Sequence, residues 1–144
     1  MKVLLFIFAC IGAINCANNA CLTVEQIAQQ VVKESDHNAD GIIQVEELVG
    51  ELTSWGLNND SCLSYHDFIA AWTTRYHDHH DTAHDFFNNL NTDGDDALCL
   101  PEVAIHVVQF DTSPRDGQIQ PAEFSAFMHA VHPDSHQPAG HGCH

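Results

Sequence analysis

The twelve residues from Asp36 to Glu47, DHNADGIIQVEE, constrain the fold more than any other stretch. Carboxylate or amide side chains stand at its first, third, fifth and twelfth positions, and Gly41 stands at the sixth. Oxygens at alternate positions of a tight turn point to one centre, which suits a hard cation that takes six to eight oxygen ligands. Glycine at the sixth position permits the sharp reversal. The alternative for this segment, loop 1, is a polar turn between two helices without metal.

Loop 1 resembles an EF-hand, and it matches the pattern of that family position by position. The resemblance implies calcium binding and an all-α fold of EF-hand-like helix-loop-helix repeats. The ligands that it implies are the side chains of Asp36, Asn38, Asp40 and Glu47 and the backbone carbonyl of Ile42.

A second copy of the same arrangement follows after about 55 residues. Amphipathic segments alternate with polar turns along the chain, and placing Asp36 over Asn91 also places Glu47 over Glu102. It places Phe68 over Phe124 when one extra residue is allowed in the last turn. Thr23 with Gln26 and Ser64 with Asp67 have the spacing of helix N-caps. We therefore expect one helical domain over residues 17–131, in two similar halves at about 22–78 and 79–131.

Loop 2, residues 56–67, lacks part of this ligand set. Glycine replaces the first carboxylate, and the shorter Asp67 replaces glutamate at the twelfth position. Asn59-Asp60-Ser61 within it is a glycosylation sequon, which indicates a solvated loop. We expect a turn without metal here.

Loop 3, residues 91–102, keeps the number of ligands. Its candidate ligands are Asn91, Asp93, Asp95, the carbonyl of Ala97, and Glu102. Asn91 brings no charge, and Asp96 replaces the glycine at the sixth position. Aspartate in a left-handed conformation there should cost roughly 1 kcal/mol.

Loop 4, residues 111–123, is one residue too long. An insertion around Pro114 and Arg115 would restore the central register Asp116-Gly117-Gln118-Ile119. The candidate ligands are then Asp111, Ser113, Asp116, the carbonyl of Gln118, and Glu123. A surface turn without metal is the alternative.

Only one short helix separates loop 1 from loop 2, and another separates loop 3 from loop 4. Each of these shared helices spans roughly 15 Å, which puts its two loops at opposite ends. Loops that are neighbours in the sequence then cannot easily pair. We expect loop 1 to pair with loop 3, and loop 2 with loop 4, through Ile43, Leu98, Leu63 and Ile119.

The N-terminal residues 1–16 have the pattern of a secretory signal peptide. A short basic start precedes an apolar run that is too short to span a bilayer, with Cys16 or Ala17 near the expected cleavage point. Four cysteines follow, Cys21, Cys62, Cys99 and Cys143, and an even number in an oxidising compartment predicts two disulfide bonds with three possible connectivities.

Charge and histidine content bear on the possible partners. A formal net charge of −16 disfavours binding to nucleic acid and to anionic membranes and favours binding to cations. His77, His80 and His84 would share a helix face if the helix is continuous there. His129, His132, His136, His141 and His144 crowd the end of the chain, and residues 132–144 are predicted to form a flexible His-rich tail. Zn²⁺ or Cu²⁺ at these histidines is therefore a second metal hypothesis, and a solvated, pH-responsive surface is the alternative.

No catalytic pattern is found in the sequence, so we do not expect an enzyme. The mature chain contains one methionine, Met128, whereas a calcium sensor should expose a methionine-rich groove. The sequence predicts a secreted, acidic calcium-binding protein of structural, buffering or calcium-scaffold type, which could engage extracellular matrix or mineral. An extracellular His-rich zinc or copper carrier is the alternative.

Overall fold

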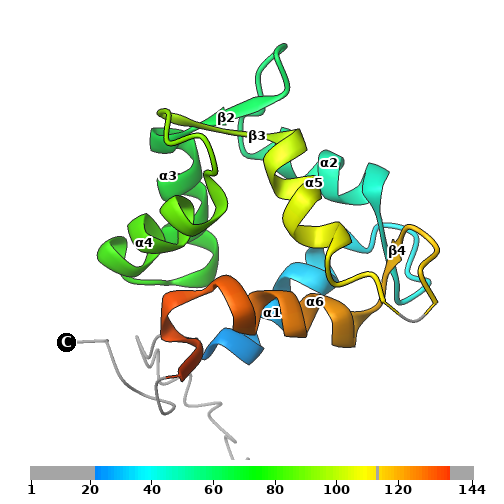
Figure 1. Ribbon diagram of the computed structural model, residues 1–144. Helices are drawn as coiled ribbons and strands as arrows, with labels where there is room; N and C mark the ends of the chain where they lie inside the picture. Colours follow the sequence, from blue (N-terminus) through cyan, green and yellow to red (C-terminus); the bar gives the residue numbers. More distant parts are fainter. Residues whose placement is uncertain (1–21, 113, 137–144) are drawn as a thin grey trace, which may run out of the picture.

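The computed structural model describes residues 22–112 and 114–136 (Figure 1). Within this part, the chain is mostly helical and forms two small two-stranded sheets. In chain order the elements are α1 (Val24–Ser35), β1 (Ile43–Gln44), α2 (Val45–Ser54), β2 (Cys62–Ser64), α3 (Tyr65–Tyr76), α4 (His80–Leu90), β3 (Ala97–Cys99), α5 (Leu100–Val108), β4 (Gln118–Ile119), α6 (Pro121–Val131) and the 3₁₀ helix η1 (Pro133–His136).

α1 and α3 begin where side chains accept hydrogen bonds from the free N–H groups of the first turn. At the start of α1, the Thr23 hydroxyl accepts a hydrogen bond from the Gln26 N–H, and the Gln26 side chain accepts one from the Thr23 N–H. The Ser64 hydroxyl accepts from the Asp67 N–H at the start of α3. Both predicted caps are confirmed, because a cap supplies partners that the helix itself cannot provide.

The short helices α2 and α5 separate neighbouring loops, as predicted. They contain 10 and 9 residues, and each lies between one strand-bearing loop and the next. β1 therefore does not pair with β2, and β3 does not pair with β4.

The predicted choice of partners is nevertheless wrong. β1 pairs with β4, with Ile43 opposite Ile119, and β2 pairs with β3, with Leu63 opposite Leu98. Loop 1 therefore lies beside loop 4, and loop 2 lies beside loop 3. The two sheets stand at separate corners of the molecule (Figure 1).

The connection between α3 and α4 explains this pairing. The two helices are of similar length and pack against each other, and only residues 77–79 join them. Such a short connection makes consecutive helices antiparallel, so the start of α3 and the end of α4 lie at the same end. Loops 2 and 3 meet there, and the packing of α1 against α6 brings loops 1 and 4 together in turn.

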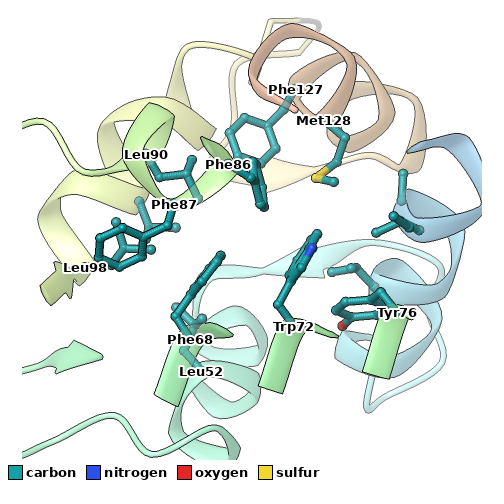
Figure 2. Close-up of a cluster of buried hydrophobic side chains, with 14 of the residues drawn as sticks. Leu52, Phe68, Trp72, Tyr76, Phe86, Phe87, Leu90, Leu98, Phe127 and Met128 are labelled. Carbon is teal, nitrogen blue, oxygen red and sulfur yellow. The ribbon is translucent and has the colours of Figure 1, made fainter. Parts of the chain in front are cut away.

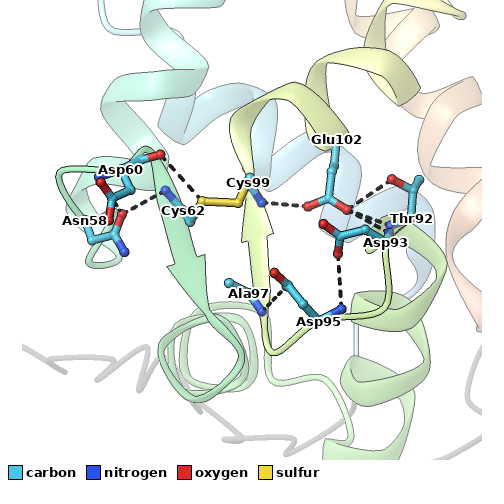
Figure 3. Close-up of a disulfide and its surroundings, with 9 residues drawn as sticks. All are labelled: Asn58, Asp60, Cys62, Thr92, Asp93, Asp95, Ala97, Cys99 and Glu102. Carbon is cyan, nitrogen blue, oxygen red and sulfur yellow. Dashed lines mark hydrogen bonds between the residues drawn. A yellow bond between two sulfur atoms is a disulfide. The ribbon is translucent and has the colours of Figure 1, made fainter.

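A disulfide bond between Cys62 and Cys99 joins β2 to β3, with the two Cα atoms 4.0 Å apart (Figure 3). The pair closes a sequence separation of 37 residues. The other two predicted disulfide cysteines, Cys21 and Cys143, lie outside the described residues.

The core lies between the helices and is rich in aromatic rings. Phe68, Trp72 and Tyr76 project from successive turns of α3 (Figure 2), and each is at most 3% exposed. The Trp72 ring centre is 4.7 Å from that of Phe86 on α4 and 4.6 Å from that of Tyr76. Contacts at these separations favour edge-on and tilted rings. This core fixes the helices that carry the four loops.

The folded part of the chain continues past the predicted boundary at residue 131. His132 is 2% exposed, and its Nε2 lies 3.0 Å from Oδ2 of Asp78, which also accepts a hydrogen bond from Trp72 Nε1. η1 packs against α4 and α6. Residues 132–136 therefore belong to the helical domain, and the rest of the predicted flexible tail, from residue 137, lies outside the described residues.

Candidate metal sites in the paired loops

The carboxylates of loop 1 turn into the loop and accept hydrogen bonds from its backbone. Asp36 accepts from the N–H groups of Asp40 and Gly41, at 3.1 and 2.9 Å. Asp40 accepts from the N–H of Ile42 at 2.9 Å. The side chain of Asn38, the third-position residue, accepts from the Asp40 N–H at 2.8 Å. These bonds hold the side chains at the first, third and fifth positions on the inside of one turn.

Glu47 closes loop 1 from the first turn of α2. Its Oε1 accepts from the N–H groups of His37 and Asn38, at 3.0 and 3.2 Å, and its Oε2 accepts from the Gln44 N–H at 3.1 Å. The Glu47 side chain is buried, and none of the ion pairs among the described residues includes it. Glu47 therefore ties the two ends of loop 1 together.

Loop 4 repeats this hydrogen-bond pattern despite its extra residue. Asp111 accepts from the N–H groups of Asp116 and Gly117, at 3.2 and 2.8 Å, as Asp36 does from Asp40 and Gly41. Asp116 accepts from the Gln118 N–H at 3.0 Å. The extra residue of loop 4 therefore lies between Asp111 and Asp116, in agreement with the position predicted from the sequence. The candidate ligand Ser113 lies outside the described residues.

Glu123 occupies the same place in loop 4 that Glu47 occupies in loop 1. It accepts from the Thr112 N–H through Oε1 at 2.9 Å and from the Gln120 N–H through Oε2 at 3.0 Å. The strands β1 and β4 then place the two loops side by side, with Ile43 and Ile119 buried between them. Loops 1 and 4 form a matched pair of acidic turns.

The donor set of this pair fits a hard cation. An ionised carboxylate has about four acceptor positions on its two oxygens, so an oxygen that accepts one N–H bond can still face an ion. Both oxygens of Asp36 and Oε2 of Glu47 meet this condition, whereas Oε1 of Glu47 accepts two N–H bonds. Loop 1 can supply oxygens from Asp36, Asn38, Asp40 and Glu47, with the carbonyl of Ile42 at the strand start. Within residues 22–112 and 114–136, no three histidine, cysteine or acidic side chains are already gathered tightly enough to hold a metal ion.

Loop 3 keeps the closing glutamate but follows a different backbone path. Glu102 accepts from the N–H groups of Thr92 and Cys99, at 2.7 and 2.9 Å (Figure 3). Asn91, however, accepts from the N–H of Gly94 and donates to the carbonyl of Asp95, instead of accepting from the fifth and sixth positions.

The expected strain at Asp96 is not found. The left-handed conformation in loop 3 is at Gly94, with φ of 75°, and Asp96 is not among the described residues with positive φ. In loop 1 the reversal uses both Ala39 and Gly41, with φ of 59° and 83°. Gly94 stands at the fourth position of loop 3, as Ala39 does in loop 1, so loop 3 keeps the first left-handed residue and has none at its sixth position. Loop 3 is therefore the less regular of the two acidic loops in the second half.

The hydrogen bonds to Glu102 affect how the stability of the protein depends on pH. Burial raises the pKa of this carboxyl, but bonds from the Cys99, Thr92 and Asp93 N–H groups outweigh burial and hold the pKa below its ordinary value of 4.5. A carboxyl with a lowered folded-state pKa stabilises the fold above its unfolded pKa, and the contribution is lost as pH falls through the folded pKa. We expect Glu102→Gln to lower the free energy of unfolding at neutral pH and to flatten its decline on acidification.

Urea unfolding at a series of pH values on both sides of 4.5 measures this effect. Asp96→Asn is the matched control, since Asp96 is an exposed carboxylate in the same loop. If Glu102→Gln and the parent chain lose stability with the same pH dependence, Glu102 does not carry this contribution.

Loop 2 has a different internal structure. The Asp67 carboxylate lies beside Gly56 at the start of the loop. Its Oδ2 accepts a hydrogen bond from the Ser64 hydroxyl at 2.7 Å, and this bond is the main cause of a lowered Asp67 pKa. Asn58 organises the turn by accepting from the N–H groups of Asp60 and Cys62. Loop 2 thus offers carboxylates at its fifth and twelfth positions, Asp60 and Asp67, and no acid at its first position. The prediction that it binds no metal is consistent with this geometry and stays a prediction.

The histidines do not form the face that the zinc hypothesis required. His77 ends α3 in a left-handed conformation with φ of 53°, and His80 begins α4, so no continuous helix carries both. Nδ1 of His84 lies 2.9 Å from the Tyr65 hydroxyl, and its Nε2 lies 3.0 Å from the Asn88 side-chain nitrogen. Of the C-terminal histidines, His141 and His144 lie outside the described residues.

Two residues that support the closing glutamates were missed by the sequence reasoning. The N–H groups of Gln44 and Gln120 hold Glu47 and Glu123, and the Gln44 side chain also donates to Asp40 at 3.2 Å. Each glutamine is the N-cap residue of the helix that carries its glutamate. The signal was present, because an N-cap residue followed three positions later by glutamate is a capping box.

In the described part of the chain, no helix has the length and apolar character needed to cross a membrane. Comparison with protein-family models, with curated proteins and with solved structures finds no match to this chain.

Proposed function

We propose that this chain is a secreted calcium-binding protein of the EF-hand type, in which loops 1 and 4 form the principal pair of sites. The observation that carries the proposal is the shared hydrogen-bond pattern of two loops that are far apart in the sequence. Asp36 and Asp111 accept equivalent bonds, and so do Glu47 and Glu123. Chance packing would not reproduce this pattern across an inserted residue.

Calcium would be bound by the oxygens that these loops turn inward. The candidate ligands are Asp36, Asn38, Asp40, the Ile42 carbonyl and Glu47 in loop 1, and Asp111, Ser113, Asp116, the Gln118 carbonyl and Glu123 in loop 4. Five or more oxygens from one loop match the coordination that Ca²⁺ prefers. Loop 3 is proposed as a weaker site with Asn91, Asp93, Asp95, the Ala97 carbonyl and Glu102, because its first ligand is uncharged and its turn is irregular.

The role of the bound calcium would be structural or buffering. A sensor presents a methionine-rich groove when it binds calcium. Met128 is 1% exposed and lies in the core, so it offers nothing to a partner. Residues 1–16 and the Cys62–Cys99 disulfide support a secreted protein, since disulfides persist in oxidising compartments. Extracellular calcium is millimolar, so even weak sites would be filled and would stabilise the fold.

Calorimetric titration of the mature protein with Ca²⁺, and then with Zn²⁺, tests the proposal. We expect calcium heats that saturate and a rise in melting temperature, since one site at a free calcium concentration of about 100 times its Kd adds about 2.7 kcal/mol of stability. Absence of both effects in millimolar calcium would refute the proposal. Submicromolar zinc binding that is lost when His77, His80 and His84 are replaced would favour the carrier hypothesis instead.

A further inference from the structure

The turn at the start of loop 2 has a chemical feature that calcium binding does not use. Asn59-Asp60-Ser61 is the one Asn-x-Ser/Thr sequence in the whole chain with a residue other than proline in the middle. This sequence is the acceptor for N-linked glycosylation, in which the serine hydroxyl is required two residues after the asparagine. The structure shows how the folded chain presents it.

Asn59 stands at the tip of a tight turn. The Ser61 N–H donates to the Asn58 carbonyl at 3.0 Å, which makes Asn59 the second residue of a four-residue turn. Asn58, Asn59 and Asp60 are all exposed. In Figure 1 the segment between α2 and β2 stands clear of the helices beside it. A large substituent at this tip would extend into solvent.

The turn does not depend on the Asn59 side chain. The neighbouring Asn58 side chain holds the turn through the N–H groups of Asp60 and Cys62 (Figure 3). No hydrogen bond of the described residues involves the Asn59 amide group. Substituting the nitrogen of the Asn59 amide therefore breaks no hydrogen bond of the turn, which depends on Oδ1 of Asn58.

The position is also separate from the principal pair of proposed calcium sites. Loop 2 is paired with loop 3 through β2 and β3, and loops 1 and 4 lie at the other sheet. Loop 2 has the poorest set of oxygen ligands of the four loops, so a glycan there would not block a good site.

We infer that Asn59 carries an N-linked glycan, an inference that rests on the proposed secretion of the chain. The Asn59 side-chain nitrogen would form a bond to the anomeric carbon of an oligosaccharide carried on a lipid pyrophosphate. The lipid pyrophosphate leaves with the bond electrons, and the amide nitrogen gives up one proton. The glycan would then lie at the end of the molecule that carries β2 and β3.

Expression of the full chain in a eukaryotic secretory cell line tests this inference. The secreted protein is expected to lose mass on treatment with peptide N-glycosidase, which converts Asn59 to aspartate and can be located by peptide mass spectrometry. Asn59→Gln and Ser61→Ala should each abolish the shift, because they remove the acceptor amide and the required hydroxyl separately. Asn88→Gln, at an exposed amide outside any sequon, is the matched control and should keep it.

Two results would overturn the inference and can be told apart. A secreted parent chain whose mass the enzyme leaves unchanged would overturn glycosylation alone, and calcium stabilisation of the same sample would then still be measurable. A chain that stays inside the cell without glycan would overturn both glycosylation and secretion.

Discussion

Glu47→Gln should weaken calcium binding by loop 1 roughly 10- to 100-fold, which corresponds to about 1.5–3 kcal/mol for the loss of a charged partner. Glutamine has the same shape, but its amide carries no charge and only one acceptor oxygen. Glu47 uses both oxygens, one towards His37 and Asn38 and the other towards Gln44. One of these sets of N–H groups would then face an NH₂ group.

The same substitution should destabilise the protein without calcium. A buried N–H group that loses its acceptor costs about 1–3 kcal/mol, and Glu47 is only 8% exposed. Calorimetric calcium titration and urea unfolding in a chelator measure the two effects separately. Glu46→Gln is the matched control, because Glu46 is an exposed glutamate in the same first turn of α2. Equal calcium affinity in Glu47→Gln and the parent chain would show that loop 1 is not a site.

Removal of the Cys62–Cys99 disulfide should lower the free energy of unfolding by about 4 kcal/mol. The bond closes a sequence separation of 37 residues and so restricts the unfolded chain. The strands that it joins have three residues each and depend on Leu63 and Leu98, which are 1% and 2% exposed. We expect the double variant Cys62→Ser with Cys99→Ser to unfold at lower urea concentration.

Calcium binding should respond unequally to this disulfide loss. The Cys99 N–H donates to Glu102, so loop 3 should weaken, whereas loops 1 and 4 belong to the other sheet and should keep their affinity. Titration of the parent chain and the double variant, with and without reductant, measures this. Reductant should lower the stability of the parent chain more than that of the double variant, in which only the predicted bond between Cys21 and Cys143 could still be reduced. A double variant as stable as the oxidised parent would contradict the prediction.

Local features of this fold could be read from the sequence. The caps at Thr23 and Ser64 depend on residues within one turn of each other, and the structure confirms them. The register of loop 4 was also recoverable, because Asp116 and Gly117 stand in the same order as Asp40 and Gly41. In each case the contacts that determine the structure join residues close together in the sequence, so the local sequence pattern predicts them.

The pairing of the loops could not be read in the same way. It depends on the reversal at residues 77–79, which makes α3 and α4 antiparallel, and on the packing of α1 against α6. His77, His80 and His84 would share a face only on a continuous helix, and the helix ends where His77 adopts φ of 53°. His132 was assigned to a tail for a related reason. Its partner Asp78 is 54 residues away in the sequence, so the residues around His132 do not indicate this contact.

The amide signals of the loop glycines provide the most direct test that loops 1 and 4 bind calcium as a pair. The Gly41 and Gly117 N–H groups donate to Asp36 and Asp111, so an ion on those carboxylates should shift both amide resonances during a calcium titration followed by NMR. We expect Gly41 and Gly117 to shift and saturate, while Gly56 in loop 2 stays unchanged. Unmoved Gly41 and Gly117 signals in millimolar calcium would contradict calcium binding at this pair of loops.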